Sequence, residues 1–411
     1  MSAGENGALR DAAAPQGDWR EVARVFGVLG LTSFGGPVAH IGYYREAIVL
    51  REKWVSDARF AELLALCQFL PGPASSQLGF ALGYQRAGWA GAFAAAVCFT
   101  LPSALALFLL AALWGAAPPD TGLVGGVVTG LKITAVAVVA HAVLGMARSL
   151  APEGARAGIA LGALAALALL PAGAFAQVAV IALGAALGAG LRLAPEPASA
   201  AAAAPERLIT PPRRTGLILL AIFAALLILL PLLASAGGII AQLASTAYRA
   251  GALVFGGGHV VLPLLEAGTV GEGLVGPGSF LAGYGAAQAM PGPLFTFATY
   301  LGQVAAGPFG AVIATLAIFA PGYLLLMGAL PFWAEIAAAP LARHAMAGAN
   351  AAVVGILGAA LYHPIFTAGI LAPSHFALAV ALFLMLTLWK RPALQVVLAG
   401  AAGGAVLSLL A

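Results

Sequence analysis

Long apolar runs separated by short charged loops fill most of this chain. Four such runs lie in its first part and four in its last part, near 88–114, 122–147, 157–171, 174–191, 308–333, 345–362, 367–389 and 393–411. A helix needs about 20 predominantly apolar residues to cross the hydrocarbon core of a bilayer. The pattern therefore predicts an all-α polytopic membrane protein, in which the run near 157–171 is a short crossing.

Clusters of proline and glycine interrupt four further apolar stretches, at 22–43, 60–84, 239–263 and 280–303. The interruptions are Phe34-Gly35-Gly36-Pro37, Gln68-Phe69-Leu70-Pro71-Gly72-Pro73, Phe255-Gly256-Gly257-Gly258 and Gln288-Ala289-Met290-Pro291-Gly292-Pro293. Broken backbone at membrane depth is tolerated only where protein or a water-filled cavity covers it. Broken helices of this kind mark the binding sites of many transporters, so the four breaks are the first candidates for a transport site.

The second half of the chain repeats the first at a spacing of about 220 residues. Gln288 follows Gln68 by 220 positions, and Phe255 follows Phe34 by 221. Pro321 follows Pro102 by 219 positions. A match of this length and consistency predicts two homologous halves.

One apolar run, near 216–235, stands alone between the halves. An odd crossing between two repeats turns the second upside down, which predicts two inverted-topology repeats with broken or re-entrant helices, joined by one extra transmembrane helix. We expect the following organisation: a disordered cytoplasmic tail at 1–19, a first repeat at 20–193, a cytoplasmic linker at 194–214, the linking transmembrane helix at 215–236, and the second, inverted repeat at 237–411.

The charged residues support this inversion. Loop 45–59 carries four basic residues, whereas its counterpart 264–279 carries none and contains Glu266 and Glu272. Lysine and arginine favour the cytoplasmic side, so the first loop is predicted inside and the second outside. The same bias predicts a cytoplasmic N-terminus and a C-terminus on the opposite side of the membrane. It also explains the net charge of +4 without a nucleic-acid partner.

The first broken segment has basic residues on both sides. Arg20 and Arg24 lie near its start, and Arg45 and Arg51 follow its end. Each arm has about ten residues, or roughly 15 Å of helix, which is half the hydrocarbon core. A re-entrant hairpin that reaches the midplane and returns is the preferred interpretation, and four full crossings are the alternative.

Composition excludes several other classes of protein. The chain is 62% hydrophobic and 8% charged, whereas a soluble domain has about 25% charged residues. This composition excludes a soluble globular protein. Cys67 and Cys98 lie in apolar stretches, so neither a disulfide framework nor a metal site is implied. We expect no cofactor and no enzymatic activity, because no flavin, haem or metal-ligand pattern is visible, and no phosphate-binding Gly-x-x-x-x-Gly-Lys motif indicates ATP-driven transport.

The broken segments closely resemble the motifs of the chromate ion transporter family, in its two-domain form. Phe34-Gly-Gly-Pro-Val-Ala-His40-Ile-Gly-Tyr43 and Leu66-Cys-Gln68-Phe-Leu-Pro-Gly-Pro-Ala-Ser75-Ser76-Gln77 are similar to that family's first copy, and Val254-Phe-Gly-Gly-Gly-His259 and Met290-Pro-Gly-Pro293 to its second. The resemblance covers about residues 20–411. It implies efflux of chromate from the bacterial cytoplasm, and hence chromate resistance, by about thirteen crossings in antiparallel halves.

The residues around the breaks suit a tetrahedral dianion. The N-termini of half-helices offer unpaired N–H groups and the positive end of a dipole, and glycines let the backbone approach an ion. Pro73 is predicted at the first position of such a half-helix. The candidate substrate-binding residues are Gly35, Gly36, Gln68, Gly72, Pro73, Ser75, Ser76, Gln77, Lys132, Gly256, Gly257, Gln288, Gly292, Pro293, Thr296 and Asn350. The alternative is that the glycines and prolines only permit tight hairpin packing.

Two of these candidates lie outside the breaks. Lys132 is a basic residue deep within an uninterrupted apolar run, where a charge costs at least ~2.5–3.5 kcal/mol on insertion scales and usually marks a pathway or a pair. We expect it to attract the anion, with a structural link to a carbonyl as the alternative. Asn350 occupies the equivalent position in the second half and would be a neutral donor.

Four further residues are candidates for gating or coupling: His40, Arg45, Glu46 and His259. A packing role is the default for the two histidines, which do not align in the repeat, and proton coupling is the alternative. Arg45 and Glu46 either gate the cytoplasmic entrance or are simply solvated.

Export of a dianion needs no obligatory proton exchange, because an interior-negative potential supplies about 2.3 kcal/mol per charge per 100 mV. Sulfate has the same charge and shape as chromate, so a sulfate or other oxyanion transporter is an open alternative. An anion channel of the same fold is another. The lipid bilayer is the second expected partner, and a homodimer is left open.

Overall fold

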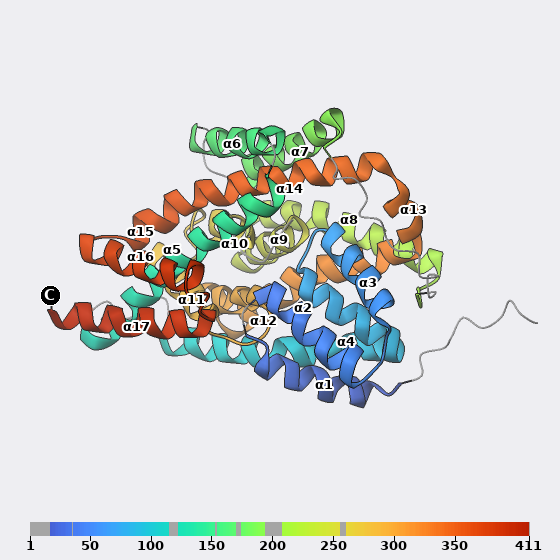
Figure 1. Cartoon of the computed structure of the whole chain (residues 1–411), viewed down its shortest axis with the longest axis horizontal. Helices are drawn as coiled ribbons and strands as arrows, with labels where there is room; N and C mark the ends of the chain where they lie inside the picture. The colour runs from blue at the N-terminus through green and yellow to red at the C-terminus, as the bar shows by residue number, and fades with distance from the viewer. Residues whose placement is uncertain are drawn as a thin grey trace, which may run out of the picture.

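The computed structural model describes residues 17–34, 36–114, 122–152, 154–169, 174–193, 208–254 and 260–410. Within these ranges every regular element is a helix (Figure 1). Among the described residues, six helical stretches are long and apolar enough to cross a membrane: Ala74–Trp114, Gly122–Leu150, Arg213–Ser235, Leu294–Ile336, Pro340–Gly369 and Ala393–Leu410. The prediction of an all-α polytopic membrane protein is confirmed. Most of the predicted tail and linker, at 1–16 and 194–207, lies outside the described residues.

The first half contains eight elements, and one helix follows it. They are α1 (Trp19–Thr32), α2 (Gly36–Tyr44), η1 (Arg45–Arg51), α3 (Asp57–Phe69), α4 (Ala74–Trp114), α5 (Gly122–Leu150), α6 (Gly154–Leu169), α7 (Ala174–Leu191) and the linking α8 (Arg213–Ser235). Polar caps start two of the helices that lead to breaks. Asp18 accepts from the N–H of Arg20, and Ser56 accepts from that of Arg59, each at 3.2 Å.

The second half follows the same order. Its elements are α9 (Ile239–Ala252), α10 (Val261–Thr269), α11 (Pro277–Ala287), η3 (Leu294–Thr296), α12 (Phe297–Ala329), η4 (Leu330–Phe332), α13 (Trp333–Ala338), α14 (Pro340–Ala360), η5 (Leu361–Phe366), α15 (Thr367–Gly369), α16 (Pro373–Thr387) and α17 (Ala393–Leu410). α9 and α10 follow each other as α1 and α2 do, and the break at 288–293 between α11 and η3 corresponds to the break at 70–73 between α3 and α4.

α4 is not one straight helix, because it folds back on itself at Ala87 and Gly88. Gly88 has φ +58° and ψ −149°, a conformation open mainly to glycine. The rings of Phe80 and Phe93 lie 5.6 Å apart, although 13 residues of straight helix would separate them by about 20 Å. Gly83 packs directly against the backbone of Gly91, which allows the two arms to approach closely.

α12 folds back in the same way, 219 residues later. Gly307 has φ +67° and ψ −161°, and Gly302 packs against the backbone of Gly310. The hydroxyls of Thr299 and Thr315 lie 2.7 Å apart across its two arms. The two folds therefore have matching backbone dihedral angles 219 residues apart, at a position that no motif had marked.

The open ends of the first-half hairpins lie together. Arg86, at the end of the first arm of α4, forms a salt bridge of 3.0 Å with Glu21 at the start of α1. The indole of Trp54, between η1 and α3, donates to the same Glu21 carboxylate at 2.9 Å. α1 and α2 therefore form one hairpin, and α3 and the first arm of α4 form another. Each hairpin leaves the same end of the molecule, turns at a break and returns to that end.

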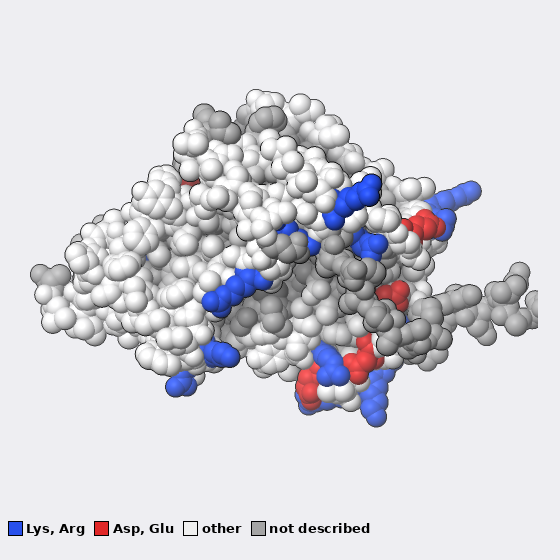
Figure 2. Space-filling model, turned by 45° about the horizontal axis from the view of Figure 1, so that its top comes forward, with Lys and Arg blue, Asp and Glu red and all other residues white. Residues whose placement is uncertain are grey.

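The linker, the start of α8 and the short second-half helix α13 reach this same end. The Gln85 amide pairs with the backbone of Ile209, and Arg213 forms a 2.5 Å ion pair with Glu335. Figure 2 shows acidic and basic side chains together at one end of the molecule, with further Lys and Arg side chains elsewhere on the face in view. The long second arm of α4 runs away from this end, and its last residue, Trp114, contacts Tyr300 of the second half.

The outer helices are exchanged between the halves. α5 of the first half packs along α16 and α17 of the second, whereas α14 of the second half packs along α6 and α7 of the first (Figure 1). Glycines allow both contacts, since Gly130 meets the backbone of Gly400 and Gly348 meets that of Gly184. Small residues permit such close approach of helices in a bilayer. The two halves are therefore interlocked.

Candidate functional site

The two Pro-Gly-Pro breaks meet the other half of the molecule through matching backbone hydrogen bonds. The N–H of Gly72 donates to the carbonyl of Val254 at 2.7 Å. The N–H of Gly292 donates to the carbonyl of Ser33 at 2.9 Å. Donors and acceptors are each related by the repeat spacing, so the pair of bonds is two-fold symmetric. Each break closes against the end of the opposite half's first helix.

Glycine is required at both donor positions by conformation and by space. Gly72 has φ +128°, and Gly292 has φ +88°. A Cβ at Gly72 would lie 2.9 Å from the Gln77 amide nitrogen and 3.1 Å from the Cα of Gly322. A Cβ at Gly292 would lie 3.1 Å from the carbonyl oxygen of Phe99. Each Gly is thus packed against the long helix arm of the other half.

Ser33, His40 and Ser75 form a buried polar chain beside these bonds. One imidazole nitrogen of His40, Nε2, lies 3.2 Å from the carbonyl oxygen of Ser33, and Nδ1 lies 3.3 Å from the hydroxyl of Ser75. His40 is 1% exposed, and its ring meets the edge of Phe99 with centroids 5.3 Å apart. His40 therefore ties α2 to the start of α4 and to the carbonyl that Gly292 uses.

The first half-helix begins one residue later than predicted. α4 starts at Ala74, and Pro73 is the residue before it. The carbonyl of Pro73 accepts a hydrogen bond from the N–H of Gln77 at 2.9 Å. Ser75 and Ser76 are buried in its first turn. The first-turn N–H groups of a helix have no partner within the helix, so they are directed at the break.

Gln77 holds this half-helix against the second half. Its amide nitrogen donates to the carbonyls of Pro71 at 3.1 Å and of Gly322 at 3.0 Å. Gln77 is fully buried, and Gly322 lies in α12. This bond is a third direct link between a break and the opposite half.

The second half-helix starts differently. Pro293 precedes η3, a single 3-10 turn, and not an α-helix. The hydroxyl of Thr296 donates to the carbonyl of Pro293 at 2.7 Å, so it satisfies its own turn. The candidate site is consequently asymmetric, with hydroxyl side chains concentrated in the first half.

Tyr323 and Thr100 border the site, and sequence reasoning missed both. The Tyr323 hydroxyl approaches the side chains of Ser76 and Thr100, and its ring stacks on Phe80 with centroids 4.5 Å apart. Pro102 and Pro321 had been aligned in the repeat, and both missed residues lie two positions from one of them. That proximity was the available signal.

The two glutamines that open the Pro-Gly-Pro motifs have different environments. Gln68 is exposed near the end of α3. Gln288 is partly buried, and its side chain approaches the hydroxyl of Tyr284 one turn earlier in α11. The structure therefore does not bring these two side chains into equivalent positions.

Lys132 and Asn350 lie on separate helix pairs. The Lys132 ammonium lies against Gly278, in the first turn of α11, whereas the break that follows α11 begins at Gln288. Ten residues of helix rise about 15 Å, so the ammonium and the break lie near opposite ends of α11. Asn350 is partly buried on α14, which packs on α6 and α7.

The remaining candidates are exposed or fall outside the described part. Arg45 makes a two-pronged ion pair with Asp57 at 2.8 and 3.1 Å, with both side chains about half exposed. Glu46 is exposed in the first turn of η1, and Gly36 begins α2 with φ +77°. Gly35, Gly256, Gly257 and His259 lie outside the described residues. Within the described part no three His, Cys, Asp or Glu side chains gather into a metal site.

Comparison with known proteins gives a consistent result. The family model described as chromate transporter matches residues 20–189 and 241–405, which leaves out the linker and the whole of α8. A chromate transport protein of Pseudomonas aeruginosa is 30% identical over 362 residues, covering 86% of this chain and 82% of its own. One of Cupriavidus metallidurans is 28% identical over 351 residues, covering 85% of this chain and 83% of its own. No solved structure matches the chain.

Proposed function

Because this chain belongs to the chromate transporter family, we propose that it exports chromate from the cytoplasm by secondary transport across a bacterial inner membrane and so confers chromate resistance. The N-terminus is cytoplasmic and the C-terminus periplasmic in this proposal. The ion is held where the two Pro-Gly-Pro breaks meet. The observation that carries this site is the pair of matching hydrogen bonds from Gly72 to Val254 and from Gly292 to Ser33.

The breaks supply the chemistry that an oxyanion needs. Unpaired N–H groups in the first turn of α4, with the positive end of its dipole, favour a negative charge. The hydroxyls of Ser75 and Ser76 add neutral donors in the same turn. Neutral donors can hold a dianion in a low-dielectric site while avoiding the excess of positive charge that would prevent its release.

The position of the site at the contact between the halves supports alternating access. Movement of one bundle of helices against another opens a site of this kind first to one side and then to the other. Gln77 and Gly72 both bond to the opposite half, so these contacts must exchange as the site changes its exposure. The membrane potential drives the outward step, at about 4.6 kcal/mol per 100 mV for two charges.

Uptake of labelled chromate into everted vesicles tests the proposal. We expect accumulation that increases with an inside-positive potential and falls at least tenfold in Ser76→Ala, with no loss in the exposed Ser149→Ala control. Accumulation of sulfate in place of chromate would reassign the substrate. Unitary currents far above transporter turnover would reassign the protein as a channel, and no transport of either ion would refute the proposal.

A further inference from the structure

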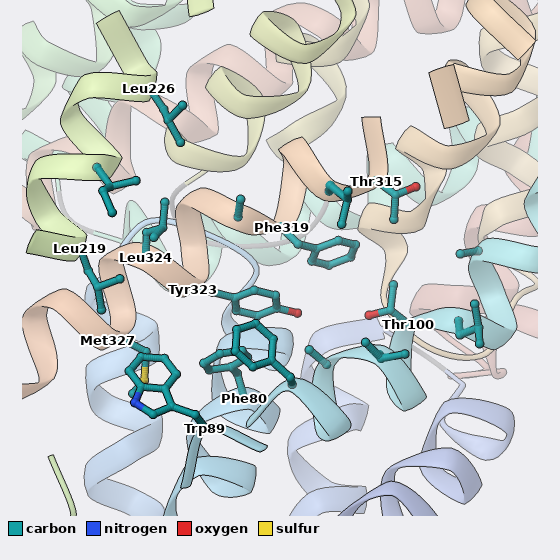
Figure 3. Close-up of a pocket in the computed structure, with 18 residues that line it drawn as sticks. Phe80, Trp89, Thr100, Leu219, Leu226, Thr315, Phe319, Tyr323, Leu324 and Met327 are labelled. Atoms are coloured by element: carbon teal, nitrogen blue, oxygen red, sulfur yellow. The ribbon is translucent and has the colours of Figure 1, made fainter. Parts of the chain in front are cut away.

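An apolar groove of about 610 Å³ lies between the linking helix α8 and the long arms of α4 and α12 (Figure 3). Its walls include Phe80 and Trp89 of α4, Leu219 and Leu226 of α8, and Phe319 and Met327 of α12. Cavities of roughly 300–1,000 Å³ typically hold small organic ligands. The groove is therefore large enough for a ligand of substantial size.

The groove opens sideways, toward the surface that the bilayer would cover. Leu316 at its edge is 63% exposed, whereas Met327 in its wall is 1% exposed. Both belong to a helix that is long and apolar enough to cross a membrane. The occupant must therefore come from the hydrocarbon region.

A dianion does not suit this groove. Among its 18 lining side chains the hydroxyls belong to Thr100, Thr315 and Tyr323, and the others are hydrocarbon or aromatic apart from the sulfur of Met327 and the indole N–H of Trp89. Burying an ion without compensating donors is prohibitively costly. The groove is thus distinct from the site proposed for chromate, although Tyr323 borders both.

The length and position of the groove match one leaflet. On α12 its lining runs from Thr315 to Met327, a rise of about 18 Å, and one leaflet of hydrocarbon is about 15 Å deep. Trp89 and Met327 line one end of the groove, and Thr100 and Thr315 line the other (Figure 3). Trp89 follows the turn of α4 just after Arg86 at the charged end, and Thr100 is next to Phe99, whose carbonyl lies against Gly292 of the second break. A tryptophan at the outer end is typical of the membrane–water interface.

We propose that this groove binds one acyl chain of a phospholipid from the leaflet at the charged end of the molecule. The acyl chain lies along α8 and fills the space between α8 and the contact of α4 with α12. It packs on Phe319 and Phe80, and through Tyr323 it reaches the neighbourhood of Ser76. A bound lipid therefore supports the contact between the two halves.

Groove-filling variants test this binding independently of transport. Ala320→Phe places a ring in the groove from α12, and Ala96→Phe does so from α4. Val312→Phe is the matched control, because Val312 is 55% exposed on α12 and does not line the groove. Retained phospholipid is counted by native mass spectrometry after extraction in mild detergent, and a phospholipid carrying a diazirine in its acyl chain maps the contact.

We expect one retained phospholipid per chain in the natural protein and in Val312→Phe, with occupancy at least fivefold lower in a groove-filling variant that elutes as a folded protein. Crosslinks should fall on peptides of α8 and on residues 315–327. Equal retention in all variants, no retained lipid in the natural protein, or crosslinks confined to other helices would overturn the proposal.

Discussion

The backbone N–H of Gly72 donates to the carbonyl of Val254 at 2.7 Å, although the two residues belong to different halves of the chain. Its counterpart runs from Gly292 to Ser33 at 2.9 Å. A broken helix leaves N–H and C=O groups unpaired, and lipid cannot satisfy them. Each half thus completes the backbone of the other, so neither half is expected to fold stably alone.

Gly72→Ala should reduce both stability and transport. The positive φ and the short Cβ distances to Gln77 and Gly322 disfavour any side chain, at a cost of about 1–3 kcal/mol. We expect a lower melting temperature in detergent and at least a tenfold fall in chromate flux. Gly158→Ala is the control, since nothing lies within 4 Å of its Cβ. Equal behaviour of the two variants would show that the contact at Gly72 is dispensable.

Gly88→Ala and Gly307→Ala should have similar effects, because the two folds in α4 and α12 are equivalent. Each glycine adopts a φ/ψ combination that costs other residues about 1–3 kcal/mol. Thermal unfolding of the two purified variants measures this. If one variant is as stable as the natural protein while the other is not, the equivalence of the folds does not extend to their energetics.

His40 and Ser75 should be coupled. His40→Ala leaves the buried Ser75 hydroxyl and the Ser33 carbonyl without their imidazole partner, at about 1–3 kcal/mol. His40→Gln keeps an amide near both groups and should retain part of the stability. A double-mutant cycle with Ser75→Ala, read by thermal unfolding, should give a coupling energy of about 0.5 kcal/mol or more. Additive losses would contradict the polar chain.

Lys132→Gln should weaken apparent affinity for chromate more than maximal flux. Removing one cationic charge from the protein reduces the attraction of a dianion, and a tenfold rise in the half-saturating concentration corresponds to about 1.4 kcal/mol. Lys132→Arg keeps the charge and is the control. Initial rates across a range of chromate concentrations separate the two parameters. Unchanged half-saturation in Lys132→Gln would remove this residue from the ion pathway.

Arg51→Cys and Glu272→Cys should lie on opposite sides of the membrane. Both natural side chains are exposed, and the inverted arrangement puts position 51 in the cytoplasm and position 272 outside. The test uses a background in which Cys67 and Cys98 are replaced by serine. A membrane-impermeant thiol reagent applied to intact cells should label position 272 alone. Labelling of position 51 from outside would contradict the hairpin topology.

The order of residue types along the chain was sufficient to predict the class of fold and to reveal the repeated motifs. Apolar runs longer than a bilayer crossing, and phrases such as Pro71-Gly72-Pro73 that recur 220 residues later, carry that information directly. Both features depend only on residue type along the chain, so they can be recognised without knowledge of any tertiary contact. The glycines of the Pro-Gly-Pro motifs, Gly72 and Gly292, were visible for the same reason.

Tertiary structure alone decided which parts meet. The acceptors for Gly72 and Gly292 are carbonyls of Val254 and Ser33, and a backbone carbonyl has no sequence signature. The fold in α4 at Gly88 looked like an ordinary position between two apolar runs, because a single glycine does not reveal its φ angle. Likewise Tyr323 borders the site only because α12 packs against α4, and the sequence contains no record of that contact.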